Sequence, residues 1–335
     1  ALCRFTENGS NLNYELLEAE TTSYPYYLKE QLEDALNISM QDLHYLDQRL
    51  AEYYAEIIKE FLKKKNVTPD LIASHGHTVL HQPDKGITLQ IGDGDVIARK
   101  TRIVTINDFR LQDVSKGGQG APLVPIGDRD LFNTYEFCLN LGGIANISFN
   151  HNDQRIACDI SPCNMASNTM TSWIGMEFDN KGRTAAKGTI HEDLLQRLNE
   201  LDYYKDNPPK SLGKEWFLHT FLPEIRKTQI TVEDALRTVN EHVAIQIAGM
   251  INTYAKEGAS VLATGGGTYN TFLMKLITEK CKAKLVIPEE KLVDFKEAIV
   301  FAYLGYLRIR NKTNVLASVT GAHSDTCAGI INYPN

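Results

Sequence analysis

Residues 137–164 read FCLNLGGIANISFNHNDQRIACDISPCN, three largely apolar runs separated by a glycine pair and by a short polar segment. This pattern predicts three strands joined by tight turns, with Gly142 and Gly143 in the first turn. Adjacent glycines permit positive φ angles and a close backbone approach, and their amide groups can converge on an anion. The first turn is therefore either a plain hairpin or a cradle for a phosphate group.

One carboxylate, Asp159, lies at the end of the third run, just before the proline-broken segment of residues 161–164. A carboxylate at a strand end beside a loop is well placed to act as a general base in a cleft. Glu297 is a second such carboxylate, because it also lies beside apolar sequence and outside any run of charges. Burial would raise the pKa of both groups toward the range useful for base chemistry.

A second glycine-rich break follows residues 260–263, which are predicted to form a buried strand. Gly265, Gly266 and Gly267 follow this strand directly, and a helix is predicted over residues 271–281. A strand, an open backbone turn and a helix N-terminus form an arrangement that suits a nucleotide. The spacing fits neither the dinucleotide fingerprint nor the P-loop, so the turn is either another kind of nucleotide site or a plain turn.

Outside these two segments, strand-like and helix-like runs alternate, which indicates the α/β class. A hairpin around Gly9 opens the chain much as the hairpin around Gly142 opens its second part, so two halves of related topology are expected. A length of 335 residues also favours two domains. Long helices are predicted over residues 41–65 and 231–255, with Thr231 as N-cap of the second.

Polar residues of the first half offer candidate ligands. His75, His77 and His81 fall in a predicted strand over residues 71–81, but no cysteine or acidic residue has matching spacing, so we favour a ligand-facing His75 and no metal site. Arg110 shares a strand face with Asp108 in this interpretation. Its guanidinium either binds a carboxylate or several oxygens with its fork, or forms an ion pair at the strand end.

Composition excludes several classes of protein. A net charge of −7 argues against nucleic-acid binding, which depends on Lys and Arg. No apolar run approaches the roughly 20 residues that span a bilayer. The six cysteines lack C-x-x-C spacing, as in a reduced, cytoplasmic protein, and no signal peptide is visible. Ala1 begins what looks like the middle of a strand, so we expect further residues upstream. A homodimer is the usual expectation for soluble enzymes in general, and we keep it as the expectation here.

Several motifs, in order along about four-fifths of the chain, resemble those of the anhydro-N-acetylmuramic acid kinases. They are Ser74-His75-Gly76, residues 88–93 (TLQIGD), Asp108-Phe109-Arg110, residues 117–123 (GGQGAPL), residues 140–146 (NLGGIAN), residues 208–211 (PPKS) and residues 264–267 (TGGG). The resemblance implies an α/β fold with two related lobes of the actin, Hsp70 and hexokinase (ribonuclease H-like) type and a nucleotide cleft between them. The expected lobes are residues 1–130 with 312–335, and residues 131–311.

The resemblance also implies the reaction. Water opens the anhydro ring of the sugar while O6 attacks the γ-phosphate of ATP, bound with Mg²⁺, to give N-acetylmuramic acid 6-phosphate and ADP in the recycling of cell-wall fragments. In this reaction Asp159 would accept the proton from water, and Glu297 would help to place sugar or water. The sugar would be bound by Arg110, His75 and Asn164. The nucleotide would be bound at its phosphates by Gly142 and Gly143 and on its adenosine side by Gly265, Gly266 and Gly267.

The sequence departs from the family pattern in three places. The family's first phosphate hairpin, Ser-Gly-Thr-Ser-x-Asp-Gly, is expected just before Ala1. Residues 159–164 read DISPCN where the family usually has DTGPGN, and His77 replaces a usual Gln. These changes keep the proposed base but bear on substrate fit and rate. The alternative reading is therefore a catalytically impaired pseudokinase of the same fold that binds sugar or nucleotide.

Overall fold

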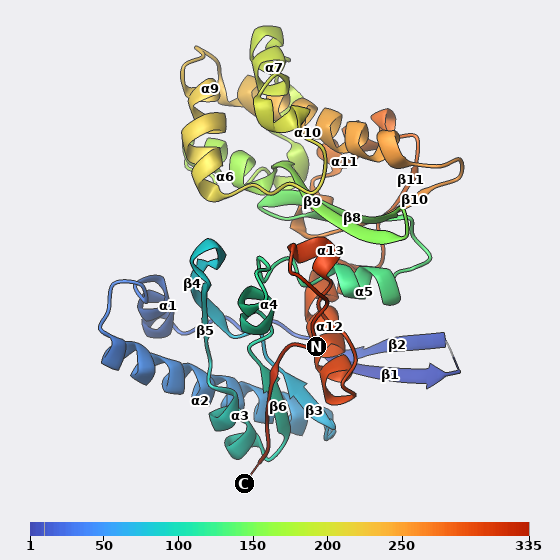
Figure 1. The fold of residues 1–335 in the computed structure, drawn as a ribbon. Coiled ribbons are helices and arrows are strands. Elements are labelled where there is room, and N and C mark those ends of the chain that lie inside the picture. Colours follow the sequence, from blue (N-terminus) through green and yellow to red (C-terminus); the bar gives the residue numbers. More distant parts are fainter. Residues whose placement is uncertain (10, 335) are drawn as a thin grey trace. The chain divides into compact units, whose positions relative to one another are not determined.

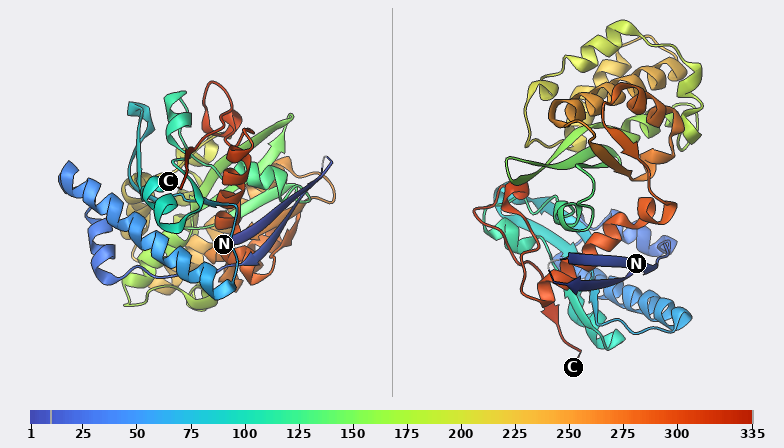
Figure 2. Two further views of the ribbon diagram at one scale, coloured as in Figure 1. Left: turned by 90° about the horizontal axis from the view of Figure 1, so that it is seen from below. Right: turned by 90° about the vertical axis from the view of Figure 1, so that its right-hand side faces the viewer.

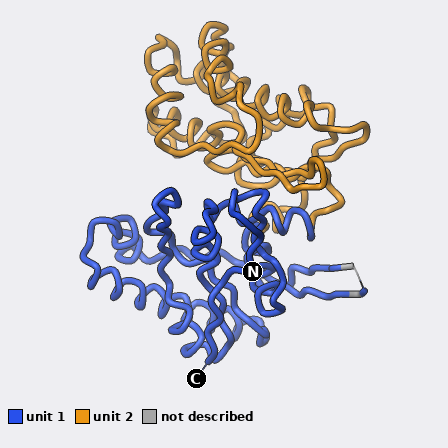
Figure 3. Tube along the Cα trace, in the orientation of Figure 1, with its two compact units in different colours: residues 1–131, 297–335 blue, residues 132–296 orange. Residues whose placement is uncertain are grey.

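The computed structural model describes residues 1–9 and 11–334. The chain forms two compact units, coloured separately in Figure 3. Unit 1 comprises Ala1–Leu131 and Glu297–Asn335, and unit 2 comprises Phe132–Lys296. The chain passes from unit 1 to unit 2 after Leu131 and returns within helix α12 (Glu290–Ile309). Each unit contains strands and helices, so the predicted α/β class is confirmed.

Unit 2 is built on a five-stranded sheet with the order β11-β10-β7-β8-β9. Its strands are β7 (Phe137–Leu141), β8 (Ile144–His151), β9 (Gln154–Pro162), β10 (Ser260–Thr264) and β11 (Lys284–Val286). The first three form an antiparallel meander, as residues 137–164 predict, and β10 and β11 continue the sheet parallel to β7. This is the strand order of the predicted ribonuclease H-like fold.

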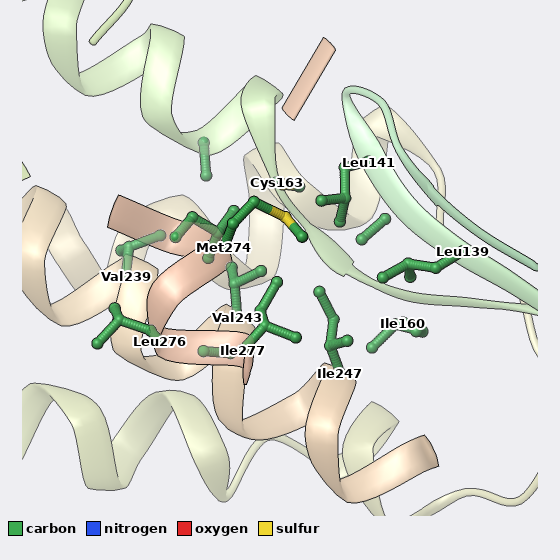
Figure 4. Close-up of a cluster of buried hydrophobic side chains, with 14 of the residues drawn as sticks. Leu139, Leu141, Ile160, Cys163, Val239, Val243, Ile247, Met274, Leu276 and Ile277 are labelled. Carbon is green, nitrogen blue, oxygen red and sulfur yellow. The ribbon is translucent and has the colours of Figure 1, made fainter. Parts of the chain in front are cut away.

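Helices pack on this sheet because both partners present continuous apolar surface. The central strand β7 is buried almost throughout, and α10 (Val232–Tyr254) begins at the predicted N-cap Thr231, whose hydroxyl accepts from the amide of Asp234. Figure 4 shows Val243 and Ile247 of α10 in the same apolar cluster as Leu139 of β7. Each such side chain contributes roughly 1.5–3 kcal/mol on burial.

The other helices of unit 2 complete its shell. They are α6 (Asn164–Ser172), α7 (Glu192–Asn199), α8 (Lys214–Trp216), α9 (Leu222–Arg226), α11 (Thr271–Lys280), the short helices η2 (Asn180–Gly182), η3 (Ala185–Lys187), η4 (Asp202–Lys205) and η6 (Gly266–Tyr269), and the π-helical turn η5 (Phe217–Phe221). Figure 1 labels α6, α7, α9 and α11.

The described residues of unit 1 form three small sheets instead of one. The hairpin of β1 (Leu2–Asn8) and β2 (Asn11–Glu18) and the hairpin of β4 (His77–Gln82) and β5 (Ile87–Ile91) are separate from the sheet β12-β6-β3, made of β3 (Leu71–Ala73), β6 (Val104–Asn107) and β12 (Ile330–Asn332). Its helices are α1 (Tyr26–Glu33), α2 (Met40–Lys65), α3 (Gly94–Thr101), α4 (Leu111–Ser115), α5 (Pro125–Asp130), α13 (Ala317–Thr320) and the short η1 (Pro83–Lys85).

The two units share an order of elements. Each begins with antiparallel strands, β1–β2 in unit 1 and β7–β8–β9 in unit 2, and helices follow them. Two parallel strands come next: β3 and β6 in unit 1, with the β4–β5 hairpin and α3 between them, and β10 and β11 in unit 2, with α11 between them. This agrees with the predicted duplication. In unit 1 the β1–β2 hairpin runs beside α12 (Figure 2), where the ring of Phe5 packs against Tyr303 and Tyr306.

Two strand predictions in unit 1 are wrong. The predicted strand 71–81 breaks into β3 and β4 at Gly76, whose φ is +73° and where a Cβ atom would lie 2.5 Å from the carbonyl oxygen of Ile91. Likewise β6 ends at Asn107, because Asp108 has a φ of +54°, and Arg110 is the N-cap residue of α4. The argument that Arg110 and Asp108 share a strand face therefore fails, although Arg110 and His75 still reach a common site.

The second predicted boundary also differs from the structure. Residues 297–311, expected in the second lobe, group with unit 1. The reason is packing: the ring of Phe301 contacts those of His75 and Phe109, and Gly305 lies against Ala73 of β3. Glu297 consequently belongs to the same unit as Arg110. Over the described ranges 1–9 and 11–334, no helix is long and apolar enough to cross a membrane.

Candidate active site

A β-bulge determines the direction of Asp159 in unit 2. In the β8–β9 ladder Asn146 pairs with Asp159 whereas the preceding Ala145 pairs with Ser161, so Ile160 is an extra residue on β9. A bulge interrupts the alternation of a strand and redirects the side chains beside it. The Asp159 side chain, which the sequence predicts to be the base, therefore does not follow the regular alternation of side chains along β9.

Residues 203–212 hold Asp159 through three hydrogen bonds. The Tyr203 hydroxyl donates to the Asp159 carbonyl oxygen at 2.7 Å, and the Asp159 amide donates to the carbonyl of Lys210 at 3.0 Å. The amide of Leu212 donates to the carboxylate oxygen Oδ2 at 2.8 Å. Among the described residues, we find no hydrogen bond to the other carboxylate oxygen, Oδ1. That oxygen is thus available to accept a proton.

The surroundings of Asp159 favour base chemistry. Burial raises the pKa of its carboxyl group above the ordinary value, and the hydrogen bond from the Leu212 amide opposes this only in part. The predicted direction of the pKa change is confirmed. A more basic carboxylate accepts a proton more readily, which suits a general base.

The two glycine turns of unit 2 lie against each other, because β7 and β10 are neighbouring parallel strands. Gly265 has a φ of +85°, and a Cβ atom there would lie 2.5 Å from Asn140 Oδ1. A Cβ atom on Gly267 would meet the side chain of Leu141 at 2.6 Å. Only glycine fits these two positions without displacing the strand end.

The turn between β7 and β8 differs in this respect. Neither Gly142 nor Gly143 has a positive φ, and a Cβ atom on either would make only ordinary contacts, at 3.4 Å or more. Their carbonyl oxygens accept the amides of residues 163–165 at the start of α6. The packing of the protein itself therefore does not require glycine at these two positions. Glycine without such a packing reason is the pattern expected where a ligand approaches the backbone.

Asn164 joins the two turns. Its side-chain nitrogen donates to the carbonyl of Leu141 at 3.1 Å, and its Oδ1 lies 3.2 Å from the position a Cβ atom would take on Gly267. The structure thus brings Asn164, which we expected to bind sugar, to the glycine turns.

A second group of predicted residues meets in unit 1. Arg110 donates from Nε and Nη2 to His75 Nε2, at 3.1 and 2.7 Å, and from Nη1 to the carbonyl of Gly120 at 2.7 Å. His75 Nδ1 lies 2.9 Å from the carbonyl of Gly76, so it carries the proton and Nε2 accepts. Burial, aided by the charge of Arg110, lowers the pKa of His75 to about 4. His75 is a neutral acceptor that orients the guanidinium.

Glu297 is near this group but does not fulfil every expectation. Its charge stabilises the charged form of Arg110, whose pKa burial lowers. However, Glu297 is exposed, so the burial that we expected for it is wrong. It is the first residue of the α12 segment that belongs to unit 1, whereas its neighbour Lys296, the last residue of unit 2, is buried.

The other two histidines make separate contacts. His81 Nδ1 pairs with the Thr88 hydroxyl at 3.0 Å across the β4–β5 hairpin, and His77 is partly buried beside the backbone of Leu32. In the part of the chain that the structure describes, no group of three His, Cys, Asp or Glu side chains is arranged to hold a metal ion.

Comparison with known proteins identifies the family. The family model described as anhydro-N-acetylmuramic acid kinase matches residues 5–334. The chain belongs to this family. A relative named anhydro-N-acetylmuramic acid kinase from Photobacterium profundum is 37% identical over 320 residues, covering 88% of this chain and 84% of the relative. Relatives of the same name from Crocosphaera subtropica and Mannheimia succiniciproducens are 33% and 34% identical and cover 100% and 99% of this chain and 95% and 94% of their own lengths.

As a member of the anhydro-N-acetylmuramic acid kinase family, the protein is a phosphotransferase that acts on an alcohol group. Sequence reasoning missed three residues around the site: Tyr203 and Lys210, which fasten Asp159, and Asp113, which is described below. The available signal was the family motif at residues 208–211, which ends one residue before the amide that contacts Asp159.

Proposed function

We propose that this protein uses ATP to phosphorylate O6 of anhydro-N-acetylmuramic acid while opening the anhydro ring with water, giving N-acetylmuramic acid 6-phosphate and ADP. The observation that carries the proposal is the family match over residues 5–334. The buried carboxylate of Asp159, with one oxygen fixed and one available, supports it.

Asp159 is the general base of the proposed reaction. It accepts a proton from water as the water oxygen bonds to C1 of the sugar and the bond from C1 to O6 breaks. O6 then takes the γ-phosphoryl group, and ADP leaves. The proton on Asp159 returns to solvent, so one water and one ATP are consumed for each sugar.

Arg110 is proposed to bind the sugar and Glu297 to help place sugar or water. The guanidinium is held by His75 and by the carbonyl of Gly120, so its direction is fixed before substrate arrives. Such preorganisation reduces the free energy that binding would otherwise spend on ordering a long side chain. The remaining donor hydrogens of a guanidinium suit a carboxylate or several sugar oxygens.

The two glycine turns are proposed to bind MgATP, with Gly142 and Gly143 at the phosphates and Gly265, Gly266 and Gly267 at the adenosine side. The open positions at Gly142 and Gly143 fit this assignment. Mg²⁺ arrives with the nucleotide and neutralises charge on its phosphate oxygens. Phosphoryl transfer depends mainly on positioning and charge neutralisation, so the protein's contribution is to hold both substrates in place. Asn164 supports both turns.

The proposal includes a cytoplasmic location, a role in recycling cell-wall fragments and a homodimeric state. Its partners are then small molecules, the anhydro amino sugar and ATP. The net charge of −7 supports the absence of nucleic acid among them.

Release of ADP tests the proposal. The full-length protein is incubated with MgATP and either anhydro-N-acetylmuramic acid or a panel of ordinary hexoses. We expect ADP only with the anhydro sugar. Equal release with hexoses would contradict the proposed substrate, and sugar binding without ADP release would indicate the pseudokinase that the altered residues 159–164 suggest.

The pH dependence of the reaction should report on Asp159. A base must be deprotonated to act, and burial raises the pKa of this carboxyl above its ordinary value of 3.8. We therefore expect kcat/KM for the sugar to fall on the acidic side with a midpoint above 3.8. The measurement is the rate of ADP release at saturating MgATP from about pH 3 to pH 8, a range that extends below the ordinary value. An acidic midpoint at or below 3.8 would contradict a buried base.

Substitution of His75 should affect sugar binding through Arg110. His75→Leu removes the acceptor for two guanidinium donors, and hydrogen bonds to charged groups contribute about 1.5–3 kcal/mol, so KM for the sugar should rise roughly tenfold. His75→Gln offers a side-chain oxygen as acceptor and should stay closer to the wild type. KM for MgATP serves as the internal control. Equal effects of the two substitutions would contradict the orienting role.

A further inference from the structure

A buried carboxylate with two different partners lies next to Arg110. Asp113, on α4, is fully buried. Its Oδ2 accepts the amide of Gly120 at 2.8 Å, and its Oδ1 accepts the hydroxyl of Thr320 at 2.8 Å. Neither partner carries a charge. A carboxylate is costly to bury in this way, so its place calls for a role beyond filling space.

Gly120 transmits this contact to Arg110. Its amide is bound by Asp113 and its carbonyl accepts from Arg110 Nη1, so one peptide residue links the two side chains. Gly120 has a φ of +63°, and Gly118 packs directly on the carboxylate of Asp113. The loop of residues 117–120 therefore has little freedom to move without moving the carbonyl that holds the guanidinium.

The C-terminal segment of unit 1 holds the same loop from its other side. The amide of Gln119 donates to the carbonyl of Thr320 at 2.8 Å, and the amide of His323 donates to the carbonyl of Lys116 at 3.1 Å. Thr320 ends α13 and binds Asp113 with its hydroxyl. The loop of residues 117–120 is thus held on one side by α4 and on the other by residues 320–323, and the Asp113 carboxylate joins these two sides.

We propose that Asp113 and Thr320 are positioning residues for sugar binding, because together they fix the Gly120 carbonyl that orients Arg110. The inference rests on the proposed function, in which Arg110 binds the sugar. Neither residue touches substrate. Both act through the loop, and their loss lets the guanidinium leave its preorganised direction.

The test uses isosteric substitutions of Thr320 in the full-length protein. Thr320→Val removes the hydroxyl and retains the shape, whereas Thr320→Ser retains the hydroxyl. Thr326→Val is the matched control: Thr326 is a buried threonine of the same C-terminal segment, and its hydroxyl has no hydrogen-bond partner among the described residues. KM for sugar and for MgATP, kcat and the melting temperature are measured for these three variants and for Asp113→Asn, together with the Kd for anhydro-N-acetylmuramic acid by calorimetry.

We expect Thr320→Val to raise both KM and Kd for the sugar roughly tenfold, as the loss of a hydrogen bond to a charged group implies. KM for MgATP should not change, and Thr320→Ser and Thr326→Val should stay within about twofold of the wild type. Asp113→Asn, which keeps the shape but turns one acceptor into a donor, should also raise the Kd for the sugar.

The outcomes separate this inference from the proposed function. If the wild type binds the sugar but releases no ADP, the proposed reaction is wrong while the Kd values still test the positioning role. If the wild type reacts and Thr320→Val matches Thr326→Val in its Kd for the sugar, the positioning role is wrong. A lower melting temperature with an unchanged Kd would show a merely structural role and overturn the inference. A wild type that binds no sugar overturns both.

Discussion

Asp159→Asn should lower kcat roughly 100- to 10,000-fold, the range that a positioned general base contributes. Asparagine has the same shape and can still accept the amide of Leu212, so the strand end and the bulge of β9 should persist. Binding of the sugar and of MgATP should therefore remain near the wild-type value. Single-turnover kinetics and calorimetry measure the two effects separately, and an unchanged kcat would remove Asp159 from the role of base.

The stability of the same variant gives an independent check. The folded state raises the pKa of Asp159, so the group's contribution to stability is present at low pH and is lost as pH rises through the folded pKa. Asp159→Asn should thus melt at or above the wild-type temperature at pH 7.

The matched control Asp234→Asn should do the opposite. Hydrogen bonds from Thr189 lower the pKa of Asp234, so its stabilising contribution is present at pH 7 and is lost as pH falls through the folded pKa. Asp234→Asn should leave kcat unchanged and lower the melting temperature slightly. Equal melting shifts for the two variants would contradict the assigned environments.

Arg110→Met should give the second large effect, a loss of roughly 100-fold in kcat/KM for the sugar, because charged hydrogen bonds contribute about 1.5–3 kcal/mol. The substitution also removes the donors to His75 Nε2 and to the carbonyl oxygen of Gly120. Arg110→Lys keeps the charge but not the fork, and should recover little. KM for MgATP should hardly change in either variant.

Arg99→Met is the control for Arg110→Met, since Arg99 forms an exposed pair with Asp95 of the kind that contributes about 1 kcal/mol or less. It should leave both KM values unchanged. The role of Arg110 would be contradicted if Arg110→Met and Arg99→Met gave the same KM for the sugar.

The features that could be predicted from sequence are local ones. The meander of residues 137–164 follows from alternating apolar runs and a glycine pair, and the helix that starts at Thr231 follows from its cap and its apolar period. Asp159 could be singled out because it is a lone carboxylate near the end of a largely apolar strand, although β9 continues beyond the predicted end to Pro162. In each case the signal lies within a few residues of the structure that it specifies.

The features that could not be predicted depend on contacts between distant segments. Gly76 breaks a strand because Ile91 of the β4–β5 hairpin passes close to its backbone. His75 orients Arg110 from 35 residues away, and Leu212 binds Asp159 from 53 residues away. Neither the periodicity of apolar residues nor the spacing of polar ones along the sequence indicates which distant residues will meet.

The same limit explains the misplaced boundary within α12. The sequence of α12 has a helical pattern on both sides of Lys296, so the sequence does not show where one unit ends. The second part of α12 belongs to unit 1 because Phe301 and Gly305 pack on that unit.

The most direct measurement of the central claim is the mass of the sugar product formed from anhydro-N-acetylmuramic acid and MgATP, with the Asp159→Asn variant run in parallel. The account predicts a product that is heavier than the substrate by one phosphoryl group and one water, formed in equal amount to ADP, and almost absent with the variant. A product that gains the phosphoryl group without water, or ADP formed with no change in the sugar, would contradict it.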